Sequence, residues 1–130
     1  MLLGAKLLKN NAILNDFKVL SQVVLKSGDP TTIYFQLVNR EAETKDLRYI
    51  PSSTATVTVT FPALDQAKIV TKTASKVFPT DDRSIWKVTL NASDKVFTGD
   101  IRISLVEGAD TFNATIQQAL QVEQNDNTYC

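Results

Sequence analysis

The stretch that most constrains the fold is TTIYFQLVN, which runs from Thr31 to Asn39. Ile33, Phe35 and Leu37 share one side of an extended chain here, because successive side chains of a strand point to opposite faces. This period of two, carried by β-branched and aromatic residues, predicts a strand in the middle of a sheet with one face in a core. A Gly-Asp-Pro turn precedes the stretch, and a charged loop follows it.

Similar segments recur along the chain at short intervals, with turn residues and charged loops between them. No segment has the period and length of a long helix. We therefore predict an all-β fold, an immunoglobulin-like antiparallel β-sandwich of about seven strands, although the Cys…Trp…Cys pattern of antibody domains is absent. Besides Thr31–Asn39, the expected extended segments are Asp16–Lys26, Leu47–Pro51, Ala55–Phe61, Ala67–Ala74, Ser84–Leu90, Asp100–Glu107 and Thr111–Val122.

The chain divides into an N-terminal arm (1–15), a β-sandwich domain (16–122) and a polar C-terminal tail (123–130). Leucines in the arm are spaced as in a short amphipathic helix, but Asn10-Asn11 disfavours a helix interior, so an irregular arm is an equal alternative. These apolar residues either cap their own sandwich or reach onto a neighbouring subunit. For the second case, the predicted interface residues are Leu2, Leu3, Leu7, Leu8, Ile13, Leu14 and, in the tail, Tyr129.

The interior is predicted from the alternation in the later strands. Trp86 is the only tryptophan, and we expect it to be the largest core side chain. Phe97 is expected to tuck under one end of the sandwich. In ATVTVTF, the valines face inward and the threonines face outward, which is typical of a solvent-facing antiparallel sheet. A sugar-binding face of hydroxyl groups is the alternative interpretation of the threonines.

The amino-acid composition argues against several classes of function. The 130 residues carry 14 basic and 14 acidic side chains, so no net charge favours nucleic acid or a membrane surface. Histidine is absent and Cys130 is the only cysteine, which leaves neither a disulfide within the chain nor a zinc site of the usual kind. Lys6 and Lys9 interrupt the first apolar run, which argues against a signal peptide. A protein made in a reducing cytoplasm is expected.

The sequence contains no recognisable catalytic pattern. Without histidine, the commonest general base is missing, and no motif pairs a serine or threonine with another base. The four glycines are isolated, so no phosphate-binding loop is present. The adjacent Asp81 and Asp82 are interpreted as a turn, because a calcium loop spaces its acids and needs more oxygen ligands. We therefore expect no enzyme activity, no catalytic residue, no cofactor and no metal.

Three segments and their order carry a family resemblance: SGDPTTIYFQLVNR, LRYIPSSTATVTVTF and SIWKVTLNASDKVFTGDIRISLVEG, followed by a final polar strand. A Gly-Asp turn precedes an aromatic strand, a Thr/Val strand follows RYIP, and Thr98-Gly99 leads into IRISL. The stretch from about Lys18 to Val122 resembles small immunoglobulin-like modules in structural proteins of tailed bacteriophages. The resemblance implies a non-enzymatic component of the baseplate, tail, neck or head decoration.

Two functions of different classes follow. The first is a virion structural protein, made in the bacterial host cytoplasm and present as a homo-oligomer or in many copies. It would contact other virion proteins through its termini and one sheet surface, and it would bind neither nucleic acid nor membrane. The alternative is a ligand-binding sandwich, such as a carbohydrate-binding or adhesin module. That alternative predicts exposed aromatic side chains on one flat face, with Tyr34, Tyr49 and Trp86 as candidates.

Overall fold

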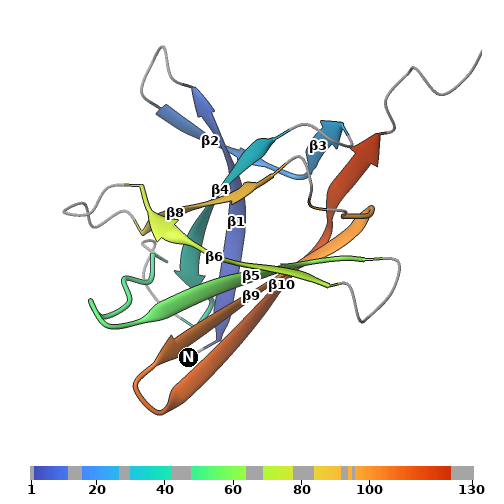
Figure 1. Ribbon diagram of the computed structural model, residues 1–130. Coiled ribbons are helices and arrows are strands. Elements are labelled where there is room, and N and C mark those ends of the chain that lie inside the picture. The colour runs from blue at the N-terminus through green and yellow to red at the C-terminus, as the bar shows by residue number, and fades with distance from the viewer. Residues whose placement is uncertain are drawn as a thin grey trace, which may run out of the picture.

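The computed structural model describes residues 2–11, 16–26, 30–41, 48–63, 69–77, 84–91, 94 and 96–123 of the 130 in the chain. Within these ranges the protein is all-β, and two five-stranded sheets pack on each other as a β-sandwich (Figure 1). The strands outnumber those expected from the sequence, because short edge strands and the N-terminal segment also join the sheets.

Sheet A has the strand order β2-β1-β4-β8-β7, and all its pairs are antiparallel. Phe35 lies at its centre, paired with Leu7 on one side and Trp86 on the other. These three side chains form one apolar row on the inner face. The strands of sheet A are β1 (Leu3–Asn11), β2 (Asp16–Leu20), β4 (Thr31–Asn39), β7 (Ser75–Lys76) and β8 (Ile85–Leu90).

Sheet B has the strand order β3-β10-β9-β5-β6. Its pairs are antiparallel except that β3 runs parallel to the end of β10, so the sandwich is mixed at this edge where an antiparallel one was expected. The strands of sheet B are β3 (Val23–Lys26), β5 (Thr56–Phe61), β6 (Val70–Thr73), β9 (Gly99–Glu107) and β10 (Asp110–Glu123).

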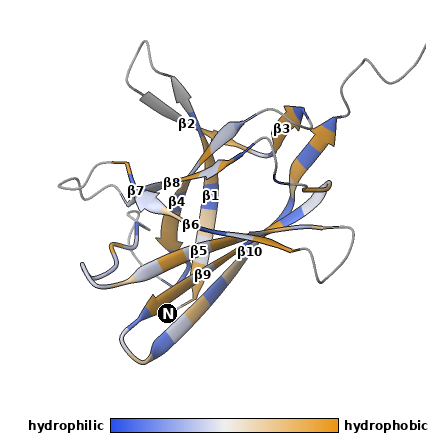
Figure 2. Ribbon diagram, in the orientation of Figure 1, coloured by the Kyte–Doolittle hydropathy of each residue, from blue (hydrophilic) through white to orange (hydrophobic). Residues whose placement is uncertain are grey.

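The core lies between the two sheets and follows the alternation of the strands. Figure 2 shows polar and apolar residues alternating along β10. Phe35, Trp86 and Ile103 are exposed by 4% or less, which confirms their predicted burial. Each such side chain contributes about 1.5–3 kcal/mol through removal of its apolar surface from water. This shared interior holds the two sheets together.

The N-terminal segment is a strand inside sheet A, where a short helix or an irregular arm was expected. β1 pairs with β2 along one edge and with β4 along the other. Leu3, Ala5 and Leu7 face the core and are buried by the protein's own chain. The physical reason is that these three residues repeat with a period of two, and pairing on both edges satisfies the backbone groups of the strand.

The prediction of a single strand from Asp16 to Lys26 is wrong. Ser21 and Gln22 separate β2 in sheet A from β3 in sheet B. Because the chain changes sheets at this point, alternation is not continuous across it. Val19 is 67% exposed, whereas Leu25 lies in the core.

β10 contains a bulge that the sequence did not reveal. The pairing with β9 jumps from Ile116–Ile101 to Leu120–Gly99, so three residues of β10 lie opposite Asp100 alone. Gln118 has a φ of 51°, and the extra residues turn both Ala119 and Leu120 into the interior. Beyond the bulge, β10 pairs with β9 only at Gly99 and continues beside its parallel partner β3.

Two connections into and out of β9 also bear on the predictions. A hairpin turn at Gly108 and Ala109 joins β9 to β10, and Gly108 has a φ of 63° that suits the first central position of a II′ turn. The expected burial of Phe97 is wrong, because Phe97 is 43% exposed and its neighbour Val96 is buried. The backbone N–H of Phe97 donates to the carbonyl of Pro62, which fixes this orientation.

Candidate functional site

The outer face of sheet B presents hydroxyl side chains in rows across neighbouring strands. In β5, the sequence TVTVTF directs its valines inward and its threonines outward. The register places Thr58 beside Thr73 of β6 and Ser104 of β9, and Ser104 beside Asn113 of β10. One row of short polar side chains therefore crosses four strands.

A second row contains a charge. Thr60 lies between Thr71 of β6 and Arg102 of β9, and Arg102 lies beside Thr115 of β10. The hydroxyl oxygens of Thr60 and Thr71 are 3.3 Å apart, which is a hydrogen bond between the two strands. The guanidinium group of Arg102 is thus surrounded by hydroxyl neighbours on the exposed side of the sheet.

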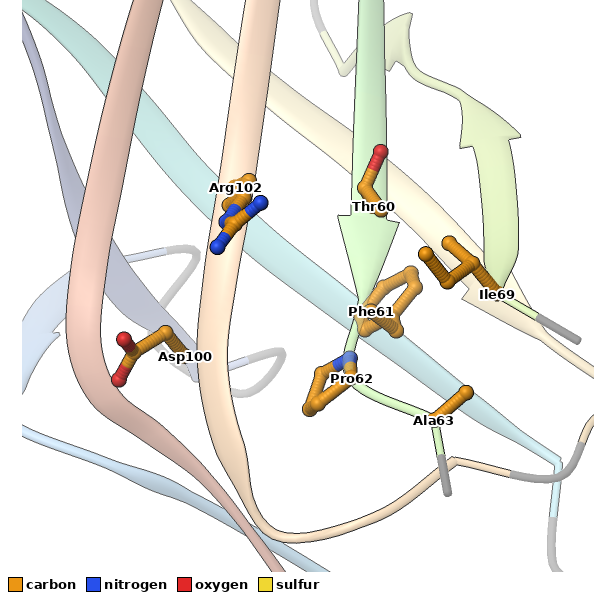
Figure 3. Close-up of a pocket in the computed structure, with 7 residues that line it drawn as sticks. All are labelled: Thr60, Phe61, Pro62, Ala63, Ile69, Asp100 and Arg102. Atoms are coloured by element: carbon orange, nitrogen blue, oxygen red, sulfur yellow. The ribbon is translucent and has the colours of Figure 1, made fainter. Parts of the chain in front are cut away.

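A hollow of about 200 Å³ opens where this row reaches the end of β5 (Figure 3). It forms because Pro62 ends the strand: proline has no N–H to continue the ladder. The lining comes from three places: the end of β5, the residue before β6, and the start of β9. The residues are Thr60, Phe61, Pro62, Ala63, Ile69, Asp100 and Arg102.

The hollow has an apolar and a polar side. Phe61 is almost fully buried beneath it, whereas Ile69 is 40% exposed. The side chain of Arg102 is exposed, and its guanidinium group makes no hydrogen bond or ion pair with any other residue that the structure describes. The hollow therefore combines exposed apolar surface at Ile69 with the guanidinium group of Arg102, and the carboxylate of Asp100 lines it as well.

Asp100 has a structural task beside the hollow. Its Oδ1 accepts a hydrogen bond of 2.8 Å from the backbone N–H of Gln118, the residue at the centre of the β10 bulge. On the other side of the bulge, the Gln22 side-chain amide donates to the Gln118 carbonyl over 3.1 Å. These two bonds satisfy the backbone N–H and C=O of Gln118, the central residue of the bulge. Part of the hydrogen-bonding capacity of Asp100 is thus used inside the protein.

A separate polar cluster joins the 48–52 segment to the end of β9. The Tyr49 hydroxyl donates to Glu107 Oε1 over 2.6 Å, and the Ser52 N–H donates to Oε2 over 3.0 Å. The pKa of Tyr49 is raised to about 12, mainly by the hydrogen bond to Glu107 and, to a smaller extent, by burial and nearby negative charge. The Ser84 hydroxyl donates to the Tyr49 carbonyl, with Ser84 at a φ of 56°. The cluster anchors a connection between the sheets.

An ion pair ties the free edge of sheet B to the segment before β9. Lys72 Nζ of β6 lies 2.9 Å from Asp94 Oδ2. The same carboxylate oxygen accepts a hydrogen bond of 2.7 Å from the Asn91 backbone N–H. That backbone bond is the main cause that lowers the pKa of Asp94, with Lys72 adding to it against the opposing effect of burial. This site stabilises a connection, and both partners are engaged.

The predicted interface residues are not gathered on one surface. Leu3 and Leu7 belong to the core, and Leu8 is buried on the outer side of sheet A. Leu2 is 54% exposed. The remaining members of the predicted set, Ile13, Leu14 and Tyr129, lie outside the described residues.

The three candidate aromatic residues do not form a common face. Trp86 is in the core, where Lys76 Nζ lies 5.7 Å from the centre of its ring. Tyr34 lies on the outer face of sheet A, and Tyr49 is bound to Glu107 beside sheet B. The flat aromatic platform that a carbohydrate-binding module was expected to show is therefore not formed by these side chains.

The hollow was missed because no residue in it stands out in the sequence. DIRISL assigns Arg102 to an outer face, but only the register brings Arg102 next to Thr60, more than forty positions earlier in the chain. The groups that line the hollow supply hydrogen bonds, one positive and one negative charge, and apolar contact. These are the means of recognition of a binding surface.

No family model matches the chain, and no curated protein matches it in sequence. Among the described residues, none belongs to a helix with the length and apolar character needed to cross a bilayer.

Proposed function

We propose that the protein is a non-enzymatic structural component of a tailed-bacteriophage virion, built on an immunoglobulin-like sandwich and assembled by protein–protein contacts. The observation that carries the proposal is the agreement between the strand order and the sequence segments that resemble such modules. The place of action is the particle, after synthesis in the host cytoplasm.

The strand order supports the immunoglobulin-like fold. Such sandwiches place strands A, B, E and D in one sheet and G, F and C in the other, with C′ added to the second sheet in variable-type domains. If β4 is strand B, the order β1-β4-β8-β7 corresponds to A-B-E-D. The order β10-β9-β5-β6 then corresponds to G-F-C-C′. The additional strands β2 and β3 lie at the edges.

The segments that carry the resemblance occupy the strands of this framework. TTIYFQLVN is β4, the Thr/Val stretch is β5, and IRISL lies in β9. The outer face of sheet B, with its hydroxyl rows and hollow, offers an accessible surface for a neighbouring subunit. Protein interfaces, taken as a whole, are about as polar as the rest of the protein surface, and a few residues in them carry most of the binding energy.

Mass spectrometry of phage particles tests the proposal. Particles induced from the organism that encodes the chain are purified on a density gradient, and the protein is quantified relative to the major capsid protein. We expect a fixed stoichiometry across the particle peak, while an abundant host cytoplasmic protein serves as the contamination control. Recovery of the chain only in the soluble lysate would overturn the virion assignment.

The hydroxyl rows favour a second candidate, a sugar-binding face on sheet B. Threonine and serine side chains, together with Arg102, present donors and acceptors that a glycan can use. A glycan array with the wild type and with Thr58→Val tests this candidate. Binding that the substitution abolishes would support a sugar-binding module, and an array without any bound glycan would remove it.

A further inference from the structure

We infer that the hollow at the end of β5 is an anchor site for a protein partner, which inserts an apolar side chain next to a carboxylate group. The inference deepens the proposed function: it rests on that function for the partner being another subunit of the particle.

The size favours a single side chain. Pockets for drug-sized ligands and cofactors have volumes of roughly 300–1,000 Å³. The hollow has about 200 Å³ and is open to solvent along the row that contains Thr60 and Arg102. Protein interfaces, in contrast, place individual anchor residues into small pockets surrounded by polar contacts. The surrounding hydroxyl rows of sheet B match that arrangement.

The apolar side gives the anchor its affinity. Pro62 and Ile69 contribute apolar lining, whereas Phe61 is 1% exposed and lies beneath the hollow (Figure 3). Ile69 is 40% exposed, so a side chain placed here would remove its apolar surface from water, which is favourable. An aliphatic residue such as leucine offers complementary apolar surface.

The charge of Arg102 determines which group of the partner would lie beside the inserted apolar side chain. The guanidinium group of Arg102 has no hydrogen-bonded or ionic partner among the described residues, whereas the carboxylate of Asp100, which also lines the hollow, accepts the Gln118 N–H. Figure 3 shows Arg102 on the side of Thr60, and Asp100 nearer the start of β9 on the side of β10. A guanidinium group pairs with carboxylates through two parallel hydrogen bonds. The occupant that satisfies both sides of the hollow is thus an apolar side chain with a carboxylate close by.

NMR titration of the isolated full chain tests the inference with three small probes. N-acetyl-leucinate carries both the apolar side chain and the carboxylate, N-acetyl-leucinamide lacks the charge, and acetate lacks the side chain. We expect saturable shifts at the amides of residues 60, 61 and 100–102 for N-acetyl-leucinate. The amide analogue should bind about two- to fivefold more weakly, which is the effect of an exposed charge pair.

Two matched substitutions assign the effect. Arg102→Gln should abolish the preference for the carboxylate probe, while Lys87→Gln on the exposed side of sheet A should leave it unchanged. Ile69→Ala should weaken both leucine probes equally. Equal binding of the carboxylate and the amide by the wild type, or no saturable shift near the hollow, would overturn the inference.

The two proposals fail separately. Probe binding by a protein that is absent from particles would keep the anchor site and remove the virion assignment. A protein present in particles whose hollow ignores all three probes would keep the virion assignment and remove the anchor site.

Discussion

The outer faces of the two sheets follow the same alternation but are not alike. On sheet A, Leu8, Val38 and Ile85 point away from the core and are nevertheless buried, at 6% exposed or less, by the protein's own chain. On sheet B, the equivalent positions carry threonine, serine and Arg102 and are at least partly accessible. The buried part of the outer face of sheet A therefore contributes to stability, although positions such as Lys6 and Lys87 on that face are exposed. The outer face of sheet B is available to a partner.

The largest expected loss of stability comes from a substitution on the inner face of sheet A. Leu7→Ala removes a side chain that is 1% exposed in β1, so we expect a loss of about 3–4 kcal/mol in the free energy of unfolding, measured by urea denaturation. Leu2→Ala, at 54% exposed, is the control and should change it by less than about 0.5 kcal/mol. Equal effects would mean that β1 is not part of the folded core.

The buried positions on the outer face of sheet A should behave almost like the core. Ile85→Ala is expected to cost about 2–3 kcal/mol, because the side chain is 6% exposed and a cavity would remain. Val106→Ala is the matched control on the outer face of sheet B, where Val106 is 41% exposed, and should cost less than about 1 kcal/mol. Similar losses in the two variants would remove the distinction between the faces.

The connection between the sheets should show an alkaline signature. Tyr49→Phe removes the hydrogen bond to Glu107 and should cost about 1 kcal/mol at neutral pH. Because the folded pKa of Tyr49 is raised from 10.0 to about 12, this contribution is complete below pH 10 and is lost as the pH rises toward 12. The difference in unfolding free energy between wild type and variant should accordingly shrink over that window. A constant difference would contradict the assigned bond.

The free edge of sheet B should show the opposite pH dependence. The pKa of Asp94 is lowered below 3.8, so its contribution is present above pH 3.8 and is lost as the pH falls through the folded pKa. Asp94→Asn should cost about 0.5–1 kcal/mol at pH 7 and progressively less in acid. Lys72→Met should have a smaller effect, since the Asn91 backbone bond is the larger cause. A larger effect of Lys72→Met would reverse that order.

The smallest effect is expected on the hydroxyl rows. Thr58→Val keeps the shape and β-branching of the side chain and removes only an outward-facing hydroxyl, so the unfolding free energy should change by less than about 0.5 kcal/mol. Thermal unfolding followed by circular dichroism measures this. A loss above about 1 kcal/mol would assign the row a structural role and weaken the case that it serves a partner.

Much of the fold was accessible to sequence reasoning where alternation was unbroken. TTIYFQLVN, ATVTVTF and DIRISLVE became β4, β5 and β9 with the expected inner faces, because in each a period of two and β-branched residues agree. Prediction failed at Asp16–Lys26, because two consecutive strands that enter different sheets look like one apolar stretch. It also failed at Gln118, since a bulge has no signature in the side chains alone.

The candidate site was not predictable in the same way. The alternation places Arg102 and Thr60 on outer faces, but their juxtaposition depends on the pairing register of β5 with β9. The hollow further requires that Pro62 end one strand while the next strand begins only at Val70.

The sequence alone determined that this protein is all-β, which residues alternate into its core, and that Trp86 lies inside. These properties follow from local periodicity, because successive side chains of a strand point to opposite faces of the sheet. Tertiary structure decided that the N-terminal leucines complete sheet A and that β3 runs parallel to β10. It also placed Arg102 beside an apolar hollow. Each of these depends on which distant strands pair, and that choice is made by the fit of whole sheets against one another.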